Sequence, residues 1–327
     1  MTLNELFDRI SNLRAAVIGD HCLDVYWHAD MRLSELSRET PHYPLPVVKE
    51  RMYPGAAANQ AACLAALEPG GVLSLGVLGH DWRANVLSHQ LENLGIDTRG
   101  LIAHPDAVTN AYIKPLRSGN SDVVYEDPRI DFENRAPLPP AAEAELTAVL
   151  EAAAPGLDLL LVCDQLAFGC VTPIIREHIC RLGREGVPVI VDSRSRISAF
   201  RHTLLKPNET EALRATGERN VLRAARQLAR LSGRPALVTL GEKGCIVSDG
   251  EAETAFSALS VPPPVDPVGA GDAFAAAFGL AYAAGADMAL AVRFASSAAA
   301  ITVKKIGCTG SASREEIMEI WETSIGA

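Results

Sequence analysis

Runs of hydrophobic residues alternate with amphipathic stretches along most of the chain. Five continuous apolar runs predict buried strands, at 14–19, 72–78, 158–163, 187–192 and 235–240. Amphipathic or Ala-rich stretches predict helices at 57–67, 83–94, 141–153, 172–185, 218–232, 271–284, 287–304 and 312–324. Strands that are apolar at every position are expected where helices cover both faces of a parallel sheet. The sequence therefore predicts an α/β fold with a doubly wound, mostly parallel sheet flanked by helices.

Two segments in the first half show a different pattern of polar residues and short extended runs. TNAYIKPL and SDVVYEDPRIDF flank the turn residues Ser118, Gly119 and Asn120 and predict a β-hairpin. The stretch after Asp20 contains LDVYW and, further on, YPLPVVKE. We expect these segments, about 20–50 and 105–130, to form a small β-sheet lid inserted within a single domain that spans 1–327.

The composition is that of a globular protein, with 48% hydrophobic and 21% charged residues among 327. The formal net charge of −10 disfavours general attraction to nucleic acid or to an anionic membrane. The longest apolar stretch is interrupted by Gly285 and Asp287 and is typical of a buried helix rather than a membrane span. Seven cysteines without a CxxC pair, and no secretory signal at the start, predict reduced thiols and a cytoplasmic location.

The segment DPVGAGD at 266–272 precedes an Ala-rich helix and carries the strongest chemical signal. Gly269 and Gly271 allow a tight turn, which with Ala270 presents backbone N–H groups at a helix N-terminus, where anions bind. Asp272 would accept the proton of an attacking hydroxyl while the N–H groups of residues 269–272 hold the transferring phosphoryl group. The alternative is an aspartate that caps a helix beside a glycine turn. The motif alone fits both interpretations.

Three further motifs suit a ligand but also have a structural explanation. PGAAAN at 54–59 places small residues and an amide before a helix, which suits sugar hydroxyls or close helix packing. Asn208 and Glu211 are three residues apart, so they could order water around Mg²⁺ or simply begin a helix. TLGEKG at 239–244 is a strand that ends in a glycine turn, which is weak evidence by itself.

The order of these motifs is similar to that of the ribokinase-like (PfkB) carbohydrate kinases, over roughly residues 14–315. DPVGAGD resembles the DTxGAGD signature of that family, and PGAAAN resembles its GGxxxN sugar motif. NETE matches its NxxE motif, and TLGEKG matches its TxGxxG nucleotide turn. The resemblance implies a kinase that uses ATP and Mg²⁺ to phosphorylate a sugar hydroxyl.

The same resemblance implies roles for individual residues. Asp24, Gly55 and Asn59 are expected to bind the sugar, and Asp272 to act as the base. Asn208 and Glu211 are expected to serve Mg²⁺. The nucleotide is expected to lie against Thr239, Gly241, Gly244 and Ser296.

Finer features resemble the heptose-7-phosphate kinases of the ADP-heptose pathway. They are GDHCLDVYW followed by PLPVV, RIDFE at 129–133, VDSRSR with Asp192 and Arg194, and KIGCT at 305–309. The resemblance implies heptose 7-phosphate as substrate, phosphorylated at the anomeric position. Arg129, Arg194 and Arg196 are candidates to meet the sugar phosphate, although each fits a solvated surface arginine equally well. The nucleotidyltransferase domain of the bifunctional members is not expected, because the chain ends at Ala327.

Several positions depart from the family pattern. Ala56 replaces the second glycine of GGxxxN, and a methyl group there would crowd a bulky sugar. Pro267 replaces the usual threonine of the signature, and Ser296 stands where this subgroup usually has asparagine. The stretch 33–43 is longer than expected. A kinase for another sugar or nucleoside, such as ribose, fructose or a keto sugar acid, is therefore the alternative function.

An alternative from another class is a non-catalytic sugar or nucleotide sensor on the same scaffold. The retained Asp272 and the Asn208/Glu211 pair argue against it, since a pure binder needs no base. The chain has no Cys/His cluster or nucleophile elbow, so zinc-enzyme and hydrolase functions have no support.

The family resemblance also implies a K⁺ site and a homodimer. The K⁺ ligands would come from two loops, several through backbone carbonyls, at Asp266, Val268, Thr302, Lys305, Gly307 and Ser311. The charge of Lys305 would weaken such a site. YPLPVVKE and TNAYIKPL are expected to form an apolar lid edge that pairs with a second subunit.

Overall fold

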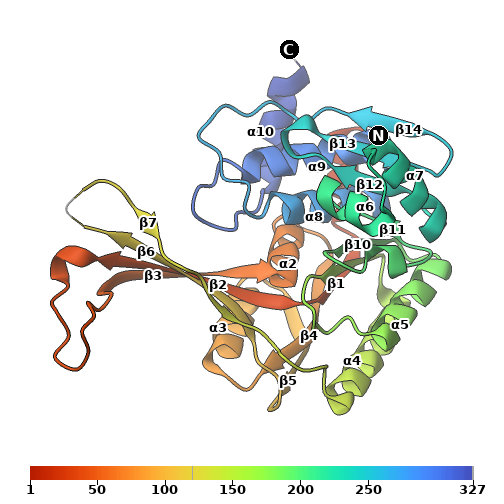
Figure 1. Ribbon diagram of the computed structural model, residues 1–327. Helices are drawn as coiled ribbons and strands as arrows, with labels where there is room; N and C mark the ends of the chain where they lie inside the picture. Colours follow the sequence, from red (N-terminus) through yellow and green to blue (C-terminus); the bar gives the residue numbers. More distant parts are fainter. Residues whose placement is uncertain (120, 326–327) are drawn as a thin grey trace.

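The computed structural model describes residues 1–119 and 121–325 and contains two β-sheets, the larger of which is covered by helices (Figure 1). In the described residues, the larger sheet has the strand order β14-β13-β12-β11-β10-β9-β1-β4-β5. Neighbours from β12 to β5 are parallel, and β13 and β14 are antiparallel. The strands are β1 (Arg14–Gly19), β4 (Gly71–Gly79), β5 (Asp97–His104), β9 (Leu159–Asp164), β10 (Val189–Ser193), β11 (Leu204–Leu205), β12 (Ala236–Thr239), β13 (Cys245–Ser248) and β14 (Glu253–Phe256). The predicted doubly wound, mostly parallel sheet is confirmed.

Helices cover both faces of this sheet. One face carries α1 (Leu3–Ile10), α2 (Ala57–Ala65), α3 (Trp82–Asn93), α8 (Ala270–Ala283), α9 (Met288–Thr302) and α10 (Arg314–Ile325). The other carries α4 (Pro140–Ala153), α5 (Pro173–Arg184), α6 (Glu209–Thr216) and α7 (Val221–Ser232). Successive residues of β1 alternate between the two cores, with Val17 in the first and Ile18 in the second.

Helix α1 was not predicted from the sequence. It begins with a capping box, in which the Thr2 side chain accepts the backbone N–H of Glu5 and the Glu5 side chain accepts that of Thr2. The pattern T-x-x-E at residues 2–5 was the signal that could have found it. No helix among residues 1–119 and 121–325 is long and apolar enough to cross a membrane.

The smaller sheet projects from the main body as an arm (Figure 1). Its strands are β2 (His21–Asp30), β3 (Val47–Ala56), β6 (Asn110–Ser118), β7 (Tyr125–Glu126) and β8 (Ile130–Phe132). β6 pairs antiparallel with both β7 and β8, as the predicted hairpin requires, while the turn residue Asn120 lies outside the described residues. β2 follows β1 after a single residue, so the two sheets are joined directly where β1 ends.

Candidate active site

The order in which the chain adds parallel strands to the larger sheet reverses between β1 and β9. From this point the chain proceeds to β4 and β5 on one side, and from β9 to β12 on the other. Ligands of open α/β sheets bind outside the carboxyl ends of the strands at such a reversal. Asp20, Gln165, Asp192 and Lys206 all lie at or just after the ends of these strands. The candidate site is therefore built at this edge.

Asp272 lies in the first turn of α8, and two amides of α2 hold its carboxylate. Asn59 Nδ2 donates to Asp272 Oδ2 at 2.8 Å, and Gln60 Nε2 donates to Asp272 Oδ1 at 3.2 Å. Desolvation raises the pKa of Asp272 to about 6, and the nearby charge of Asp192 adds to the rise. Gln60 was missed by sequence reasoning, although it directly follows Asn59. A carboxylate that is fixed in orientation and titrates near neutrality is suited to accept a proton from an alcohol.

The glycine turn at residues 269–272 has the geometry that its glycines predict, but it has fewer free backbone N–H groups than the sequence suggested. Gly269 has φ of +80°, a conformation that favours glycine, and a Cβ there would lie 3.1 Å from Asn59 Nδ2. The N–H groups of Ala270 and Asp272 donate to backbone carbonyls within the turn, at 3.2 and 3.1 Å. In the described part of the chain, only the N–H groups of Gly269 and Gly271 remain free among residues 269–272. Of the four backbone N–H groups that we expected to face a ligand, two are free, because the other two donate to carbonyls within the turn.

Asp24 is buried on β2 and faces Gly55 on β3. A Cβ at Gly55 would lie 3.0 Å from Asp24 Oδ2, so glycine at this position makes room for the carboxylate. Burial raises the pKa of Asp24, while the charges of Lys114 and Arg129 act against the rise. Lys114 was not predicted, and its ammonium also donates to Tyr26 Oη at 2.8 Å. The smaller sheet therefore brings one buried carboxylate and two cations together.

Arg129 and Arg194 contribute positive charge at this side of the site. The Arg129 guanidinium pairs with Asp131 at 2.6 and 2.7 Å and lies over the Tyr112 ring, 4.2 Å from its centroid. Arg194 is exposed, and its charge lowers the pKa of both Tyr112 and Glu211 against the opposing effect of burial. Arg194 therefore lies within electrostatic range of both the smaller sheet and the start of α6.

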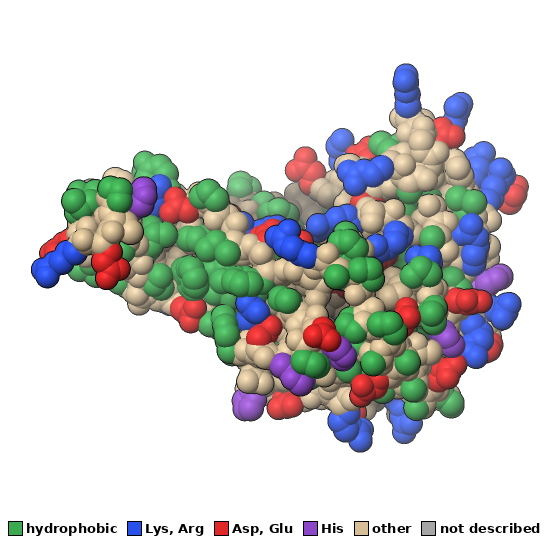
Figure 2. Space-filling view, turned by 60° about the horizontal axis from the view of Figure 1, so that its bottom comes forward, with side chains coloured by type: hydrophobic (Ala, Val, Ile, Leu, Met, Phe, Trp, Pro, Cys, Tyr) green, Lys and Arg blue, Asp and Glu red, His purple; other side chains and the backbone are tan. Residues whose placement is uncertain are grey.

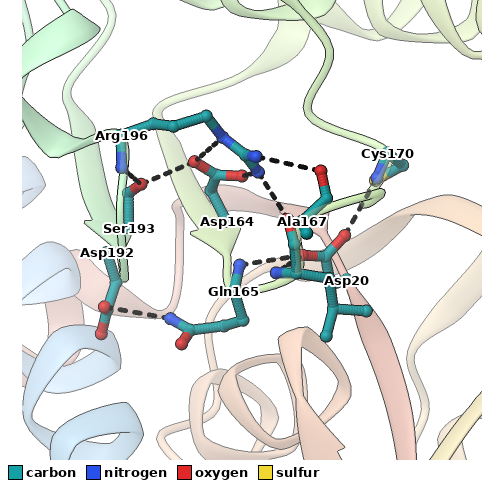
Figure 3. Close-up of polar contacts among 9 residues, drawn as sticks. Asp20, Asp164, Gln165, Ala167, Cys170, Asp192, Ser193 and Arg196 are labelled. Atoms are coloured by element: carbon teal, nitrogen blue, oxygen red, sulfur yellow. Dashed lines mark hydrogen bonds and ion pairs between the residues drawn. The ribbon is translucent and has the colours of Figure 1, made fainter. Parts of the chain in front are cut away.

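Arg196 has a structural role instead. Its Nε donates to Asp164 Oδ2 at 3.1 Å, and the same guanidinium donates to the carbonyls of Leu166 and Ala167 (Figure 3). Asp164 is fully buried, so this arginine neutralises a charge in the interior. Asp20 completes the arrangement by accepting three backbone N–H groups of the loop, from Gln165, Leu166 and Cys170, at 2.8 to 2.9 Å. The expectation that Arg196 meets a sugar phosphate is not supported, because its donors order the loop after β9.

Asn208 and Glu211 form the capping box of α6. Asn208 Oδ1 accepts the N–H of Glu211, and Glu211 Oε2 accepts the N–H of Asn208, both at 2.9 Å. The helix-start explanation is therefore correct, and it uses one oxygen of each side chain. The second carboxylate oxygen of Glu211 is left for a water molecule on a metal ion, so the pair also fits Mg²⁺.

The predicted nucleotide turn lies beside this capping box, because Thr239 and Asn208 form a parallel β-bridge. Gly241 has φ of +61°, and no atom lies within 4 Å of the place where its Cβ would be, so the turn borders open space. Gly244 has φ of +96°, and a Cβ there would overlap a backbone carbonyl of β14. Gly244 is therefore required for packing. Ser296 lies half-buried within α9.

The residues predicted to bind K⁺ come from two loops that hydrogen bonds join. Gly307 N donates to Asp266 Oδ2 at 2.9 Å, and Val268 N donates to Asp266 Oδ1 at 3.1 Å. Thr302 is buried at the end of α9, and its hydroxyl has no hydrogen-bond partner among the described residues. Both oxygens of the Asp266 carboxylate thus accept backbone N–H groups.

The ammonium of Lys305 lies among these predicted K⁺ ligands. Its ammonium donates to the carbonyl of Ser311 at 2.5 Å and pairs with Glu316 at 2.8 Å. A carbonyl that accepts a hydrogen bond from an ammonium is poorly placed to bind a second cation as well. In this arrangement the Ser311 carbonyl, one of the six predicted K⁺ ligands, already binds a cation.

Sequence reasoning did not identify a chain of polar contacts that runs along the sheet edge. Asp192 accepts a hydrogen bond from Gln165 Nε2 at 3.1 Å (Figure 3), and its other oxygen pairs with Lys206 Nζ at 2.8 Å. The available signal was a lysine directly after a buried strand and two residues before the NxxE motif. Across the described ranges, no group of three or more His, Cys, Asp or Glu side chains could hold a metal ion by itself.

A carboxylate suited to accept a proton, a turn with free N–H groups and a pair that fits Mg²⁺ meet at one edge of the sheet. This combination is suited to a phosphotransferase that acts on an alcohol group. Residues 21–315 match the pfkB family of carbohydrate kinases. The chain belongs to this family and is a carbohydrate kinase.

Relatives of known sequence support the same assignment. The bifunctional protein HldE of Gluconobacter oxydans is 35% identical over 317 residues, which cover 93% of this chain and 63% of that protein. This chain thus spans less than two thirds of the length of that relative.

Solved structures confirm the fold. The ribokinase of Arabidopsis thaliana, in complex with ribose and ATP, has a TM-score of 0.70 at 22% identity, over 94% of this chain and 98% of that one. An Escherichia coli protein solved in complex with ATP and Mg²⁺ has a TM-score of 0.69 at 17% identity, over 95% of this chain and 99% of that one. The ribokinase-like architecture predicted from the motifs is therefore confirmed.

Proposed function

We propose that this kinase transfers the terminal phosphoryl group of ATP to the anomeric hydroxyl of heptose 7-phosphate. One observation carries the proposal. The Asp272 carboxylate is held by Asn59 and Gln60 directly beside the free N–H groups of the Gly269–Gly271 turn. Transfer of a phosphoryl group to an alcohol requires a base close to backbone groups that bind an anion.

In the proposed mechanism, Asp24, Gly55 and Asn59 bind and orient the sugar. Asp272 takes the proton of the attacking hydroxyl, and the two free N–H groups stabilise charge on the transferring phosphoryl group. Positioning and electrostatic stabilisation supply most of the acceleration in phosphoryl transfer. Asn59 has two tasks, because it also fixes the orientation of the base.

ATP and Mg²⁺ are the proposed cofactors, as in the Escherichia coli protein of the same fold. Asn208 and Glu211 would hold the waters of Mg²⁺, and the ion would neutralise phosphate charge. Thr239 and Gly241 would border the nucleotide, since the bridge to Asn208 places them beside that pair. Ser296 on α9 is proposed to lie near the adenine of the nucleotide.

The cations of the smaller sheet support a phosphorylated sugar. Lys114 and Arg129 both act on the buried Asp24, and Arg194 is within electrostatic range of the same sheet. The net charge of the chain is −10, so a substrate phosphate needs a local group of cations. The similarity to HldE and the heptose-kinase motifs favour heptose 7-phosphate within this class.

A coupled ADP-release assay with ATP and Mg²⁺ tests the proposal. The panel contains heptose 7-phosphate, fructose 1- and 6-phosphates, ribose and common nucleosides. Preferred turnover of heptose 7-phosphate is expected. Preferred turnover of ribose or of a nucleoside would replace the substrate assignment, and binding without turnover on the whole panel would favour a sensor.

K⁺ is not part of the proposed mechanism, because Lys305 already occupies the carbonyl of Ser311.

A homodimer is proposed through the smaller sheet. Figure 2 shows hydrophobic side chains gathered along this arm, and the exposed ones include Val47, Val48 and Tyr125. A cytoplasmic location is proposed because all seven cysteines are free thiols.

A further inference from the structure

Lys206 is a buried lysine at the centre of the candidate site. Its side chain is 4% exposed, and it follows β11, with its backbone N–H bonded to the carbonyl of Val191 at 2.8 Å. Its ammonium pairs with Asp192 at 2.8 Å, and Asp192 is held on its other oxygen by Gln165 (Figure 3). The direction of the ammonium is therefore fixed by a chain of contacts that begins in the loop after β9.

The ammonium lies close to the first turn of α8. A Cβ built on Gly271 would lie 4.0 Å from Lys206 Nζ, so the cation lies next to the residue that carries one of the two free N–H groups. An ammonium has three N–H donors, and Asp192 is its one hydrogen-bonding partner in the described part of the chain. Donors thus remain for a ligand at the start of α8.

The surrounding charges keep this group protonated. Burial acts to lower the pKa of Lys206, but the charges of Asp192, Glu211 and Asp272 outweigh it and the pKa is raised. Three carboxylates around one lysine leave an excess of negative charge where the nucleotide phosphates must enter. Without the cation, this edge of the sheet would repel them.

We propose that Lys206 is a catalytic residue that binds the terminal phosphate of the nucleotide, with Asp192 as its positioning residue. This inference rests on the proposed function. In the step it serves, the sugar oxygen bonds to the terminal phosphorus and the bond to the bridging oxygen breaks. ADP leaves with that electron pair, the hydroxyl proton goes to Asp272, and Lys206 stays protonated throughout while stabilising the equatorial oxygens.

The competing explanation is that Lys206 only neutralises Asp192. A buried ion pair with that role can be replaced by neutral groups at little cost, whereas removal of one partner leaves an uncompensated charge. Removal of the lysine alone therefore cannot distinguish the two explanations, but removal of both charges can.

The test uses Lys206→Met alone, Asp192→Asn alone and the two combined, with the exposed Lys304→Met as control. Affinities for ATP and for ADP are measured by calorimetry without sugar, and turnover by ADP release. Lys206→Met is expected to lower turnover at least ~100-fold and to weaken ATP binding much more than ADP binding. The combined variant is expected to remain as slow as Lys206→Met, and Lys304→Met to behave as wild type.

Recovery of turnover in the combined variant, or an equal loss of ATP and ADP affinity, would overturn the proposal. If Lys206→Met does not fold, the combined variant carries the test, because neither buried charge remains in it. If wild type turns over no sugar on the panel, the proposed function fails. The ratio of ATP to ADP affinity still reports on Lys206 in that case, because it is measured without sugar.

Discussion

At the scale of single residues, the reactivity of Asp272 depends on its surroundings. Burial disfavours the charged carboxylate, whereas the amides of Asn59 and Gln60 and the charge of Lys206 favour it. The balance places the pKa at about 6, well above the usual value for aspartate. The side chain is thus ionised at neutral pH, yet it holds a proton more readily than an exposed aspartate does.

We expect turnover to fall as the pH decreases through about 6, because protonated Asp272 cannot accept the hydroxyl proton. Above this pH the carboxylate is ionised and turnover is expected to level off.

Asp272→Asn should lower kcat by roughly 10²–10⁴-fold and leave ATP affinity little changed, since general-base assistance has this magnitude. Steady-state kinetics from pH 5 to 8 and calorimetry with ATP provide the measurement.

Asp249→Asn is the control, because Asp249 is exposed in the turn between β13 and β14. Circular dichroism at each pH separates loss of activity from unfolding. Near-wild-type turnover by Asp272→Asn, or a flat profile down to pH 5, would remove Asp272 from its role.

Ala56 shows local strain at the same scale. It precedes α2 with φ of +50° and ψ of −123°, a conformation suited to glycine. Alanine carries a Cβ that disfavours this conformation, so the start of α2 forms here at the cost of backbone strain.

Ala56→Gly is expected to raise the free energy of unfolding by about 1 kcal/mol. Relief of about 1–3 kcal/mol of strain exceeds the roughly 0.5–1 kcal/mol lost through the flexibility of glycine in the unfolded chain. Ala62→Gly within α2 is the matched control and should lower stability by about 1 kcal/mol. Urea unfolding monitors both, and equal destabilisation by the two changes would show that position 56 is unstrained.

At the scale of elements, the starts of α2 and α8 meet to form the site. Asn59 and Gln60 come from the first, and Asp272 comes from the second, more than 200 residues later in the chain. The loop that follows α9 contacts the same region, since Thr309 Oγ1 donates to the carbonyl of Pro54 at 2.9 Å. Small residues at these helix starts allow this approach.

We expect wild-type turnover to respond little to K⁺, and Lys305→Met to become K⁺-responsive. The substitution frees the carbonyl of Ser311 and removes the positive charge that it now binds. Lys304→Met is the control, because the Lys304 ammonium bonds the carbonyl of Pro262 instead. Turnover is titrated with KCl at constant ionic strength, and a strict K⁺ requirement in wild type would contradict the role given to Lys305.

At the scale of the whole molecule, the two sheets have different surfaces. Helices cover the larger sheet on both faces, whereas the smaller sheet leaves hydrophobic side chains exposed (Figure 2). β3 is an edge strand of the smaller sheet, and Val47 and Val48 on it are exposed by 45% and 59%. Exposed apolar edge strands are suited to pairing with a second chain.

We therefore expect a dimer in solution, with twice the 34.8 kDa of one chain. Val48→Lys should shift the protein to monomer, because a charge at the paired edge would be buried without a partner. Leu222→Lys on α7 is the control, since Leu222 is also exposed but lies on the main body. Light scattering measures the mass, and a monomeric wild type would exclude the assembly.

The sequence by itself determined the α/β class, the position of most strands and helices, and the motifs that converge on the site. Hydrophobic periodicity and glycine placement are local properties, so they can be read from neighbouring residues. The motifs around Asp272 and Asn59 were found in this way, whereas Asp24 was predicted from the family resemblance.

Only the tertiary structure decided which polar groups are free. It showed that two of four turn N–H groups are used, that Arg196 neutralises Asp164, and that Lys305 bonds to Ser311. It also showed Lys206 beside the start of α8. These outcomes depend on hydrogen bonds and charges between residues that are distant in the chain. Periodicity carries no information about such pairs, because folding alone brings them together.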